Sequence, residues 1–187
     1  MISATVKNSI NEAENNIDSE LVVLRPFCEE FITQRYLSWF EDEEILRFSN
    51  QRFKEHSAQS SLAYLKSFDN TANLFFAIFT KAETPEMIGT MTAYVSKNHS
   101  TADIGILIGE RSSWGKGFGA SAWITLMNYL FQTHSMRKIT GGTLAENYGM
   151  LSIFKRANMQ PDGVRKQQEI ANGKLQDVLY FARFGNE

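Results

Sequence analysis

The sequence has little of several features that define whole classes of protein. A single cysteine, Cys28, among 187 residues excludes disulfide frameworks and multi-cysteine zinc sites. The formal net charge of -2 gives no basic field for nucleic acid, and no basic run indicates a membrane surface. No apolar run approaches the length that crosses a bilayer, and the N-terminus lacks the apolar core of a signal peptide. We therefore expect a cytoplasmic protein that binds neither nucleic acid nor membrane.

What the sequence does contain is enough apolar material for one packed domain. Hydrophobic residues make up 43% of the chain and aromatic residues 12%, which is typical of a folded core. Residues 1–20 are polar and have no sustained period, so we expect a polar N-terminal arm followed by one domain over residues 21–187. The three histidines have no metal-ligand spacing, so no metal site is expected.

Residue periodicity predicts an α/β protein. Alternating or β-branched apolar runs indicate strands, apolar residues at helical spacing indicate helices, and Asn172-Gly173 predicts a hairpin. The predicted strands cover residues 21–24, 74–80, 87–96, the stretch from 103, 138–143 and the two arms of the hairpin within 160–184. The predicted helices cover residues 29–40, 57–68, the stretch from 117 to 131, and the stretch after 145.

The centre of the chain joins a short apolar strand to a long apolar helix. Ile104, Ile106 and Ile108 alternate at period two, which predicts a strand. Trp123 and later apolar residues recur at helical spacing, so a helix is expected to begin near Gly117. The sequence W-G-K-G-F-G-A between them predicts a glycine-rich turn whose N–H groups meet at the positive end of the helix. Such an arrangement suits a phosphate group.

Two common phosphate-binding motifs fit this turn poorly. A Walker-type loop requires G-x-x-x-x-G-K followed by Ser or Thr, but Gly109 and Gly115 are one residue too far apart and Gly117 follows Lys116. A dinucleotide fingerprint requires G-x-G-x-x-G, whereas Gly115, Gly117 and Gly119 give G-x-G-x-G. The sequence therefore argues against both motifs.

The turn resembles the acetyl-CoA signature of the GNAT superfamily of N-acetyltransferases, [QR]-x-x-G-x-[GA], which joins a strand to a helix. Gly117 and Gly119 take its glycine places, and Ala120 follows. Trp114 stands where the general pattern has Gln or Arg. The sequence W-G-K-G-aromatic is similar to the branch that contains ribosomal-protein N-terminal acetyltransferases and related amino-sugar acetyltransferases. The resemblance covers roughly Leu21 to Phe184.

This resemblance implies an α/β (α+β) fold in one domain. The expected architecture is a central, mixed, mostly antiparallel sheet of about seven strands flanked by about four helices. The resemblance also implies acetyl-CoA as co-substrate and an amine as acceptor.

The stretch after residue 143 carries the second part of the resemblance, which is the superfamily pattern N-x-x-[AS]-x-x-x-[YL]-x-K. Asn147 matches the asparagine, Phe154 takes the aromatic place and Arg156 the basic one, while Met150 replaces the small residue. Many relatives carry a tyrosine in the place of Phe154 that can protonate the departing thiolate, which phenylalanine cannot do. These differences leave open an alternative, a non-catalytic acetyl-CoA-binding regulatory module.

The resemblance implies an acetyl-CoA site built from the strand, the turn and the two following helices. A bulge at 105–108 is expected to leave a backbone N–H free for the thioester oxygen, with pantetheine between this strand and the strand at 138–143. The residues expected to bind the cofactor are Ile106, Leu107, Ile108, Trp114, Gly115, Lys116, Gly117, Phe118, Gly119, Ala120, Asn147, Phe154 and Arg156.

Acetyl transfer to an amine requires a group that removes a proton, because a lysine-like amine with a pKa of about 10.4 is protonated at pH 7. Asp103 is the first candidate for this catalytic base, because it starts the strand expected to carry the thioester. Glu110 and Glu146 are alternates. Tyr148 is a candidate proton donor.

The segment between the first two predicted helices, residues 39–52, is expected to wall the acceptor pocket. Its four consecutive carboxylates, Glu41 to Glu44, are suited to attracting a cationic amine, although Asp42 is equally suited to capping a short helix. The residues expected to contact the acceptor are Trp39, Glu41, Phe48 and Arg52.

The sequence thus predicts an acetyl-CoA-dependent N-acetyltransferase in which a primary amine attacks the thioester directly. The acceptor classes left open are protein N-termini, amino sugars and other small-molecule amines such as polyamines or aminoglycosides. The sequence also leaves open whether the chain forms a homodimer.

Overall fold

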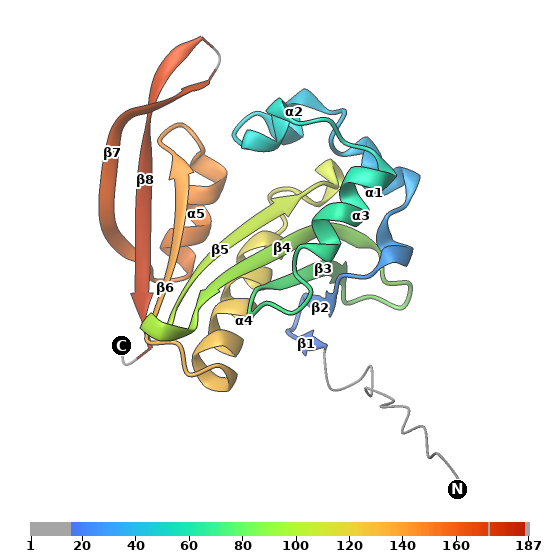
Figure 1. The fold of residues 1–187 in the computed structure, drawn as a ribbon, viewed down its shortest axis with the longest axis horizontal. Helices are drawn as coiled ribbons and strands as arrows, with labels where there is room; N and C mark the ends of the chain where they lie inside the picture. Colours follow the sequence, from blue (N-terminus) through green and yellow to red (C-terminus); the bar gives the residue numbers. More distant parts are fainter. Residues whose placement is uncertain (1–15, 172, 186–187) are drawn as a thin grey trace, which may run out of the picture.

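Eight strands form one mixed sheet in a computed structural model that describes residues 16–171 and 173–185 (Figure 1). The spatial order is β1-β2-β3-β4-β5-β6-β8-β7, and all neighbouring pairs are antiparallel except β5 and β6, which are parallel. The strands are β1 (Ile17–Asp18), β2 (Val22–Pro26), β3 (Leu74–Thr80), β4 (Met87–Ser96), β5 (Thr101–Ile108), β6 (Lys138–Leu144), β7 (Gln160–Ala171) and β8 (Lys174–Phe184).

Five α-helices and four 3-10 turns accompany the sheet in the described part of the chain. The α-helices are α1 (Gln34–Ser38), α2 (Glu43–Leu46), α3 (Ala58–Lys66), α4 (Phe118–Thr133) and α5 (Tyr148–Arg156). The 3-10 turns are η2 (Glu29–Phe31), η3 (Asn50–Phe53), η4 (Lys97–His99) and η5 (Arg111–Ser113). These elements confirm the predicted fold class, with eight strands and five helices in place of about seven and four. No described helix is long and apolar enough to cross a bilayer.

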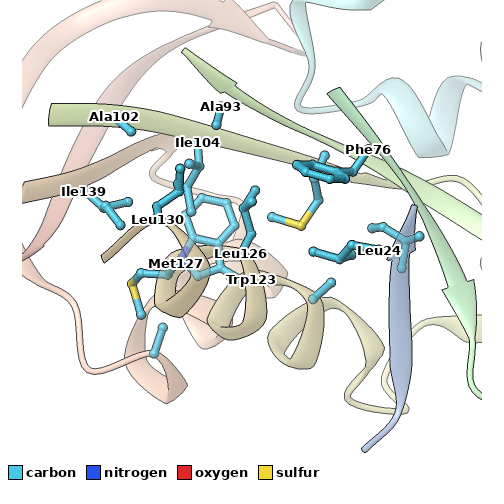
Figure 2. Close-up of a cluster of buried hydrophobic side chains, with 14 of the residues drawn as sticks. Leu24, Phe76, Ala93, Ala102, Ile104, Trp123, Leu126, Met127, Leu130 and Ile139 are labelled. Atoms are coloured by element: carbon cyan, nitrogen blue, oxygen red, sulfur yellow. The ribbon is translucent and has the colours of Figure 1, made fainter. Parts of the chain in front are cut away.

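The largest core lies between the sheet and α4. Trp123, Leu126 and Leu130 on α4 are fully buried against inward-facing residues of β2 to β6, including Leu24 and Ile104 (Figure 2). Their recurrence at helical spacing and the alternation along β5 explain why both elements form where the sequence predicts them. Burying such a side chain contributes about 1.5–3 kcal/mol, so this seam fixes α4, and the turn before it, against β5.

The opposite face of the sheet carries a second, aromatic core. Phe75 and Phe79 of β3 pack there with Tyr36 of α1 and Phe68, which follows α3. The sheet is therefore the middle of three layers, with α4 and α5 on one face and α1 and α3 on the other (Figure 1).

The first predicted helix and the N-terminal arm differ from expectation. The helix expected over 29–40 is interrupted, because the Thr33 side chain accepts a hydrogen bond from the Tyr36 N–H and caps a new start at Gln34. Within the arm expected at residues 1–20, Ile17–Asp18 pairs with β2. Residues 1–15 lie outside the described residues.

The feature that shapes the site is the separation of β5 from β6. The two strands pair only from Thr101–Lys138 to Asp103–Thr140, and from there they diverge (Figure 1). The pairing of β4 with β5 continues without a register shift to Ile108, so the bulge expected at 105–108 is absent from this ladder. The open edge of β5 arises from the divergence of the strands instead.

Candidate active site

The glycine-rich turn adopts the conformation that its sequence requires. Gly115 and Gly117 have φ values of +74° and +89°, a region that glycine enters without steric cost. Gly117 is the N-cap of the 16-residue helix α4, and no side chain caps that end of the helix. The N–H groups of the first helical turn therefore face the cavity in front of α4 without a side-chain partner.

We call this cavity, of about 470 Å³, the turn pocket. It lies between the open edge of β5, the glycine-rich turn and α5. Most of the residues predicted to bind the cofactor line it, namely Ile106, Leu107, Ile108, Trp114, Gly115, Gly117, Gly119, Ala120, Asn147 and Arg156. Its further lining includes Glu44, Ile45, Phe48, Ser49, Ser113, Gly149, Met150, Ser152 and Ile153.

The open edge of β5 presents backbone N–H groups to the turn pocket. The Gly109 N–H donates to the Ile88 carbonyl on β4 (3.0 Å), and in an antiparallel ladder the backbone groups of successive residues point to alternate sides. The groups of Ile106 and Ile108 therefore point away from β4, toward the gap before β6. The Ile108 carbonyl on that side accepts a hydrogen bond from the Trp114 indole (2.9 Å), which fixes the start of the turn to the strand.

Two predicted residues shape the turn pocket from α5. Asn147 caps this helix, because its side-chain oxygen accepts a hydrogen bond from the Met150 N–H (3.1 Å). A Cβ atom added at Gly117 would lie 3.9 Å from Nη1 of Arg156, so this guanidinium lies at the turn. The pocket therefore combines main-chain donors with one positive charge, a chemistry that suits phosphate oxygens.

The prediction that Phe154 binds the cofactor is wrong. Phe154 is 0% exposed and packs in the core against Trp123 and Phe181, with ring centroids 5.3 Å and 4.8 Å apart. The helical spacing puts position 154 on the face of α5 that meets the sheet. The side chains of Lys116 and Phe118 are also outside the lining of the turn pocket, and these residues contribute main chain to the turn.

A second cavity of about 470 Å³, the aromatic pocket, lies on the other face of the sheet. It meets the turn pocket at three residues that line both, Ser49, Ile106 and Leu107. The other side chains and backbone that line it are those of Tyr36, Phe40, Gln51, Lys54, Glu55, His56, Ser60, Ser61, Tyr64, Phe75, Thr90, Thr92, Tyr94 and Gly105.

Hydroxyl groups dominate the polar surface of the aromatic pocket. The hydroxyls of Tyr64 and Tyr94 lie 2.8 Å apart, and burial raises the pKa of Tyr64 well above its usual range. Burial also raises the pKa of Tyr36 to about 12, against the opposing effect of a hydrogen bond with Ser61. These phenols therefore stay protonated at neutral pH and act as neutral hydrogen-bonding groups.

Apart from Ile106 and Leu107, the residues of the aromatic pocket, including His56, are not among those that the sequence predicts for the site. His56 stacks on Phe40 with centroids 4.1 Å apart, and its Nε2 lies 2.9 Å from the Gln51 carbonyl. One signal is present in the sequence, since Thr90, Thr92 and Tyr94 place polar groups at period two in an otherwise apolar strand.

Asp103 lies where β5 and β6 part. It is the last residue of β5 paired with β6, and it stands directly opposite Tyr94 on β4. The Thr140 hydroxyl donates to its carboxylate (2.7 Å). Asp103 is exposed, yet desolvation by its neighbours raises the pKa of its carboxyl group, and the hydrogen bond from Thr140 opposes this shift.

Asp103 itself lines neither pocket, and the other predicted acid–base groups also lie outside both linings. Glu110 is bound by Arg35 and Ser112, whose hydrogen bonds lower the pKa of its carboxyl group, so it is a poor proton acceptor. Glu146 lines neither pocket. Tyr148 is 74% exposed and also lines neither, so the structure does not bring this hydroxyl to the site.

Three of the four residues predicted to contact the acceptor line neither pocket. Trp39 is 4% exposed and packs over Gly109, where an added Cβ would overlap its ring. Glu41 is exposed on the surface. Arg52 donates to the backbone carbonyls of Ser49 and Ile170 and so ties η3 to β7.

The fourth residue predicted to contact the acceptor, Phe48, does line a pocket, and Asp42 has one of its two expected roles. Phe48 lines the turn pocket rather than the aromatic pocket. Asp42 caps α2, accepting hydrogen bonds from the N–H groups of Glu44 (2.9 Å) and Ile45 (3.3 Å), which confirms the capping interpretation for this residue.

A pocket at a helix N-terminus, a strand edge opened by divergence and a second pocket beyond it lie side by side in this α/β fold. Residues 22–160, more than half of the chain, match the family model of the acetyltransferase (GNAT) domain. The chain therefore belongs to the GNAT acetyltransferase family and is an acyltransferase, which confirms the prediction made from the glycine-rich turn.

Individual relatives agree with this assignment. The chain is 29% identical over 154 residues to an uncharacterized N-acetyltransferase, p20, of Bacillus licheniformis, covering 80% of this chain and 85% of that protein. Its fold is similar to that of RimL, a ribosomal L7/L12 N-terminal acetyltransferase solved with coenzyme A, with a TM-score of 0.78, 18% identity, and 90% and 97% of the two chains covered.

A spermidine N-acetyltransferase from Vibrio cholerae, solved with CoA and spermine, gives a TM-score of 0.77 at 20% identity, covering 88% of this chain and 96% of that one. At such identities the two structural similarities concern the fold alone. The acceptor must be inferred from this chain's own pockets.

Proposed function

We propose that this chain transfers the acetyl group of acetyl-CoA to a primary amine. The observation that carries the proposal is the meeting of the two pockets at Ile106 and Leu107, on the open edge of β5. A thioester in one pocket and an amine in the other would come together at this edge. The turn pocket is taken by the donor, because it has the main-chain and cationic groups that suit a pyrophosphate.

The residues of the turn pocket have distinct roles in this proposal. The N–H groups from Gly115 to Ala120 and the Arg156 guanidinium bind the pyrophosphate, and no metal is needed for this contact. The pantetheine arm lies along β5 as an additional strand would, using the backbone groups of Ile106 and Ile108. One of these N–H groups stabilises the negative charge that develops on the thioester oxygen.

The amine enters from the aromatic pocket and attacks the thioester carbon. A carbon–nitrogen bond forms, the carbon–sulfur bond breaks, and the sulfur leaves as the thiol of CoA by taking up the proton that the attacking nitrogen loses as the amide forms. The amine must first lose a proton, which costs roughly 4–5 kcal/mol at pH 7 for a pKa of about 10.4. Asp103 serves as the base, because its raised pKa brings it closer to that of the amine and it stands opposite Tyr94, which lines the aromatic pocket.

Protein N-termini, amino sugars and small-molecule amines remain the candidate acceptors, since each presents a primary amine. Aromatic rings and hydroxyl groups line the aromatic pocket, together with one carboxylate, Glu55, and one ammonium group, Lys54. The pocket therefore supports an acceptor of mixed character that carries little net charge.

The family assignment and the named N-acetyltransferase relatives argue against the alternative left open by the sequence, an acetyl-CoA-binding module without catalysis. Phe154 is the observation in its favour, because the tyrosine hydroxyl expected from the resemblance is replaced here by a phenylalanine ring buried in the core. The two functions differ in whether acetyl-CoA is consumed when an amine is present.

Calorimetric titration with acetyl-CoA, followed by a free-thiol release assay, tests the proposal. The assay panel contains N-terminal peptides, amino sugars, polyamines and aminoglycosides. Binding with turnover on one class is expected and would identify the acceptor. Binding without turnover on any amine would support the binding module, and absence of binding would overturn both functions.

A further inference from the structure

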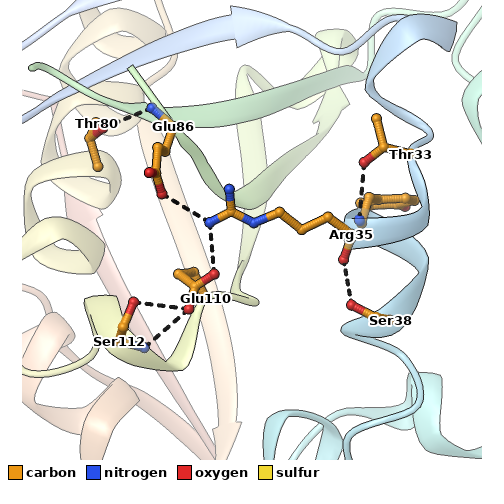
Figure 3. A network of polar contacts seen from close by, with 8 residues as sticks. Thr33, Arg35, Ser38, Thr80, Glu86, Glu110 and Ser112 are labelled. Carbon is orange, nitrogen blue, oxygen red and sulfur yellow. Dashed lines mark hydrogen bonds and ion pairs between the residues drawn. The ribbon is translucent and has the colours of Figure 1, made fainter. Parts of the chain in front are cut away.

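The segment that carries α1 and α2 is joined to the segment that leads from β5 into the glycine-rich turn. Figure 3 shows the main connection, in which Nη2 of Arg35 on α1 lies 2.8 Å from Oε2 of Glu110 and 3.0 Å from Oε2 of Glu86. Arg35 thus reaches from the helix to two carboxylates, of which one, Glu110, directly precedes η5 and the turn.

Glu110 also contacts the main chain that leads into the turn. Its Oε1 accepts hydrogen bonds from the N–H and the hydroxyl of Ser112, at 3.3 Å and 2.9 Å, and so caps η5 (Figure 3). Glu110 and Glu86 raise the pKa of the Arg35 guanidinium, with Glu110 the larger influence. Arg35 and Ser112 in turn lower the pKa of Glu110, so the carboxylate stays ionised at neutral pH.

Two further contacts join the same segments. The ring of Trp39 covers Gly109, the residue before Glu110, so closely that a Cβ there would clash. Arg111, the residue after Glu110, pairs with Asp42, the cap of α2, at 3.4 Å. Three consecutive residues on the path to the turn are therefore held by side chains of residues 35–42.

Residues on both sides of this junction line the two pockets. Tyr36, next to Arg35, and Phe40 line the aromatic pocket, whereas Glu44 of α2 lines the turn pocket. Ser113 and Trp114, which follow the Glu110–Ser112 cap, line the turn pocket as well. The junction therefore connects α1, beside the aromatic pocket, with the glycine-rich turn at the turn pocket.

We propose that Arg35 is a positioning residue that acts through Glu110 to hold the glycine-rich turn in its CoA-binding conformation. The inference rests on the proposed function, because it assumes that CoA binds the turn pocket. Arg35 lines neither pocket itself, so its effect on CoA must pass through Glu110. Glu86 shares the same guanidinium but belongs to the approach to β4, so it offers a matched control for the loss of an ion pair.

The test compares four variants with the wild-type protein by calorimetric titration with CoA. Arg35→Gln and Glu110→Gln are each expected to weaken CoA binding about two- to fivefold, which corresponds to the loss of one partly exposed ion pair. The double variant should be no weaker than Glu110→Gln alone, because both changes remove the same contact. Glu86→Gln should bind CoA as the wild type does.

Hydrogen–deuterium exchange of the amides over residues 109–120 gives a second readout. These amides should exchange faster in Arg35→Gln and Glu110→Gln, but not in Glu86→Gln. Wild-type CoA affinity in Arg35→Gln, or additive losses in the double variant, would overturn the inference. Absence of CoA binding by the wild type would instead overturn the proposed function on which it rests.

Discussion

The two pockets have the same volume, about 470 Å³, but they are built from different parts of the chain. The turn pocket depends on the main chain, with two glycines in the left-handed region, a helix N-terminus that no side chain caps, and an open strand edge. The aromatic pocket depends on side chains such as Tyr64 and Tyr94, which come from elements far apart in the sequence.

This difference separates what the fold determines from what individual residues determine. A pyrophosphate is recognised by N–H groups that every residue carries, so the donor side depends on backbone conformation. Acceptor recognition depends on which rings, hydroxyls and charges line the aromatic pocket, and it changes with each substitution. We expect changes of backbone conformation to alter donor binding and changes of side chain to alter acceptor use.

The largest effect should come from Gly117→Val. A β-branched residue is strained at φ +89°, and relief of that strain would move the turn. We expect about tenfold to hundredfold weaker acetyl-CoA binding in calorimetry. Gly173→Val is the matched control, because φ is +71° there but the residue lies in the β7–β8 hairpin. The control should lose stability and keep its affinity for acetyl-CoA. A folded Gly117→Val variant with wild-type acetyl-CoA affinity would contradict a donor site that depends on backbone conformation.

Phe154→Tyr tests whether this position belongs to the core rather than to the site. An added hydroxyl would be buried among apolar rings, costing about 1–3 kcal/mol if it finds no partner. For a chain of this length the melting temperature should fall by about 2–12 °C. Phe53→Tyr, at a position that is 72% exposed, should leave it unchanged. A gain in turnover by Phe154→Tyr without loss of stability would contradict the assignment.

Tyr94→Phe should affect the acceptor side alone. The substitution removes the hydroxyl that lies 2.8 Å from that of Tyr64, and one hydrogen bond contributes about 0.5–1.5 kcal/mol. We expect KM for the amine to rise about twofold to tenfold while the Kd of acetyl-CoA stays the same. Tyr129→Phe on α4, outside both pockets, is the control. A parallel change in acetyl-CoA affinity would show that the two pockets do not act separately.

Asp103→Asn should change stability the least. The size of that change should depend on pH. Because the pKa of Asp103 is raised in the folded protein, the native state binds its proton more tightly, and stability falls as pH rises through that pKa. The neutral variant should melt above the wild type at pH 7, and the difference should disappear in acid, below the usual aspartate pKa of about 3.9.

The same variant tests the role of Asp103 as base. Turnover should fall while acetyl-CoA affinity is retained, and Asp69→Asn, an exposed carboxylate outside both pockets, should change neither. An unaltered pH–rate profile in Asp103→Asn would remove Asp103 from the mechanism.

The parts of the molecule that could be predicted from sequence are those with local signals. The alternation of Ile104, Ile106 and Ile108 and the spacing of apolar residues after Gly117 each follow from one element's geometry, and both elements form as predicted. The turn could be predicted because glycine enters the left-handed region without steric cost. The spacing of the glycines therefore indicates the backbone conformation.

The parts that could not be predicted depend on contacts between distant segments. Trp39 is buried because Gly109 leaves room for its ring, and Arg52 reaches β7 rather than an acceptor. Phe154 faces the core because of the rotation of α5 against the sheet, which its motif alone does not reveal. The residues of the aromatic pocket have no common motif, since the folding of the chain alone brings them together.

The most direct test of the account is a crystal structure of the protein with CoA. We predict that the pyrophosphate is bound by the N–H groups between Gly115 and Ala120, with the thiol at Ile106 and Leu107 where the two pockets meet. CoA bound with its pyrophosphate away from the turn, or with its thiol outside the gap between β5 and β6, would contradict the account.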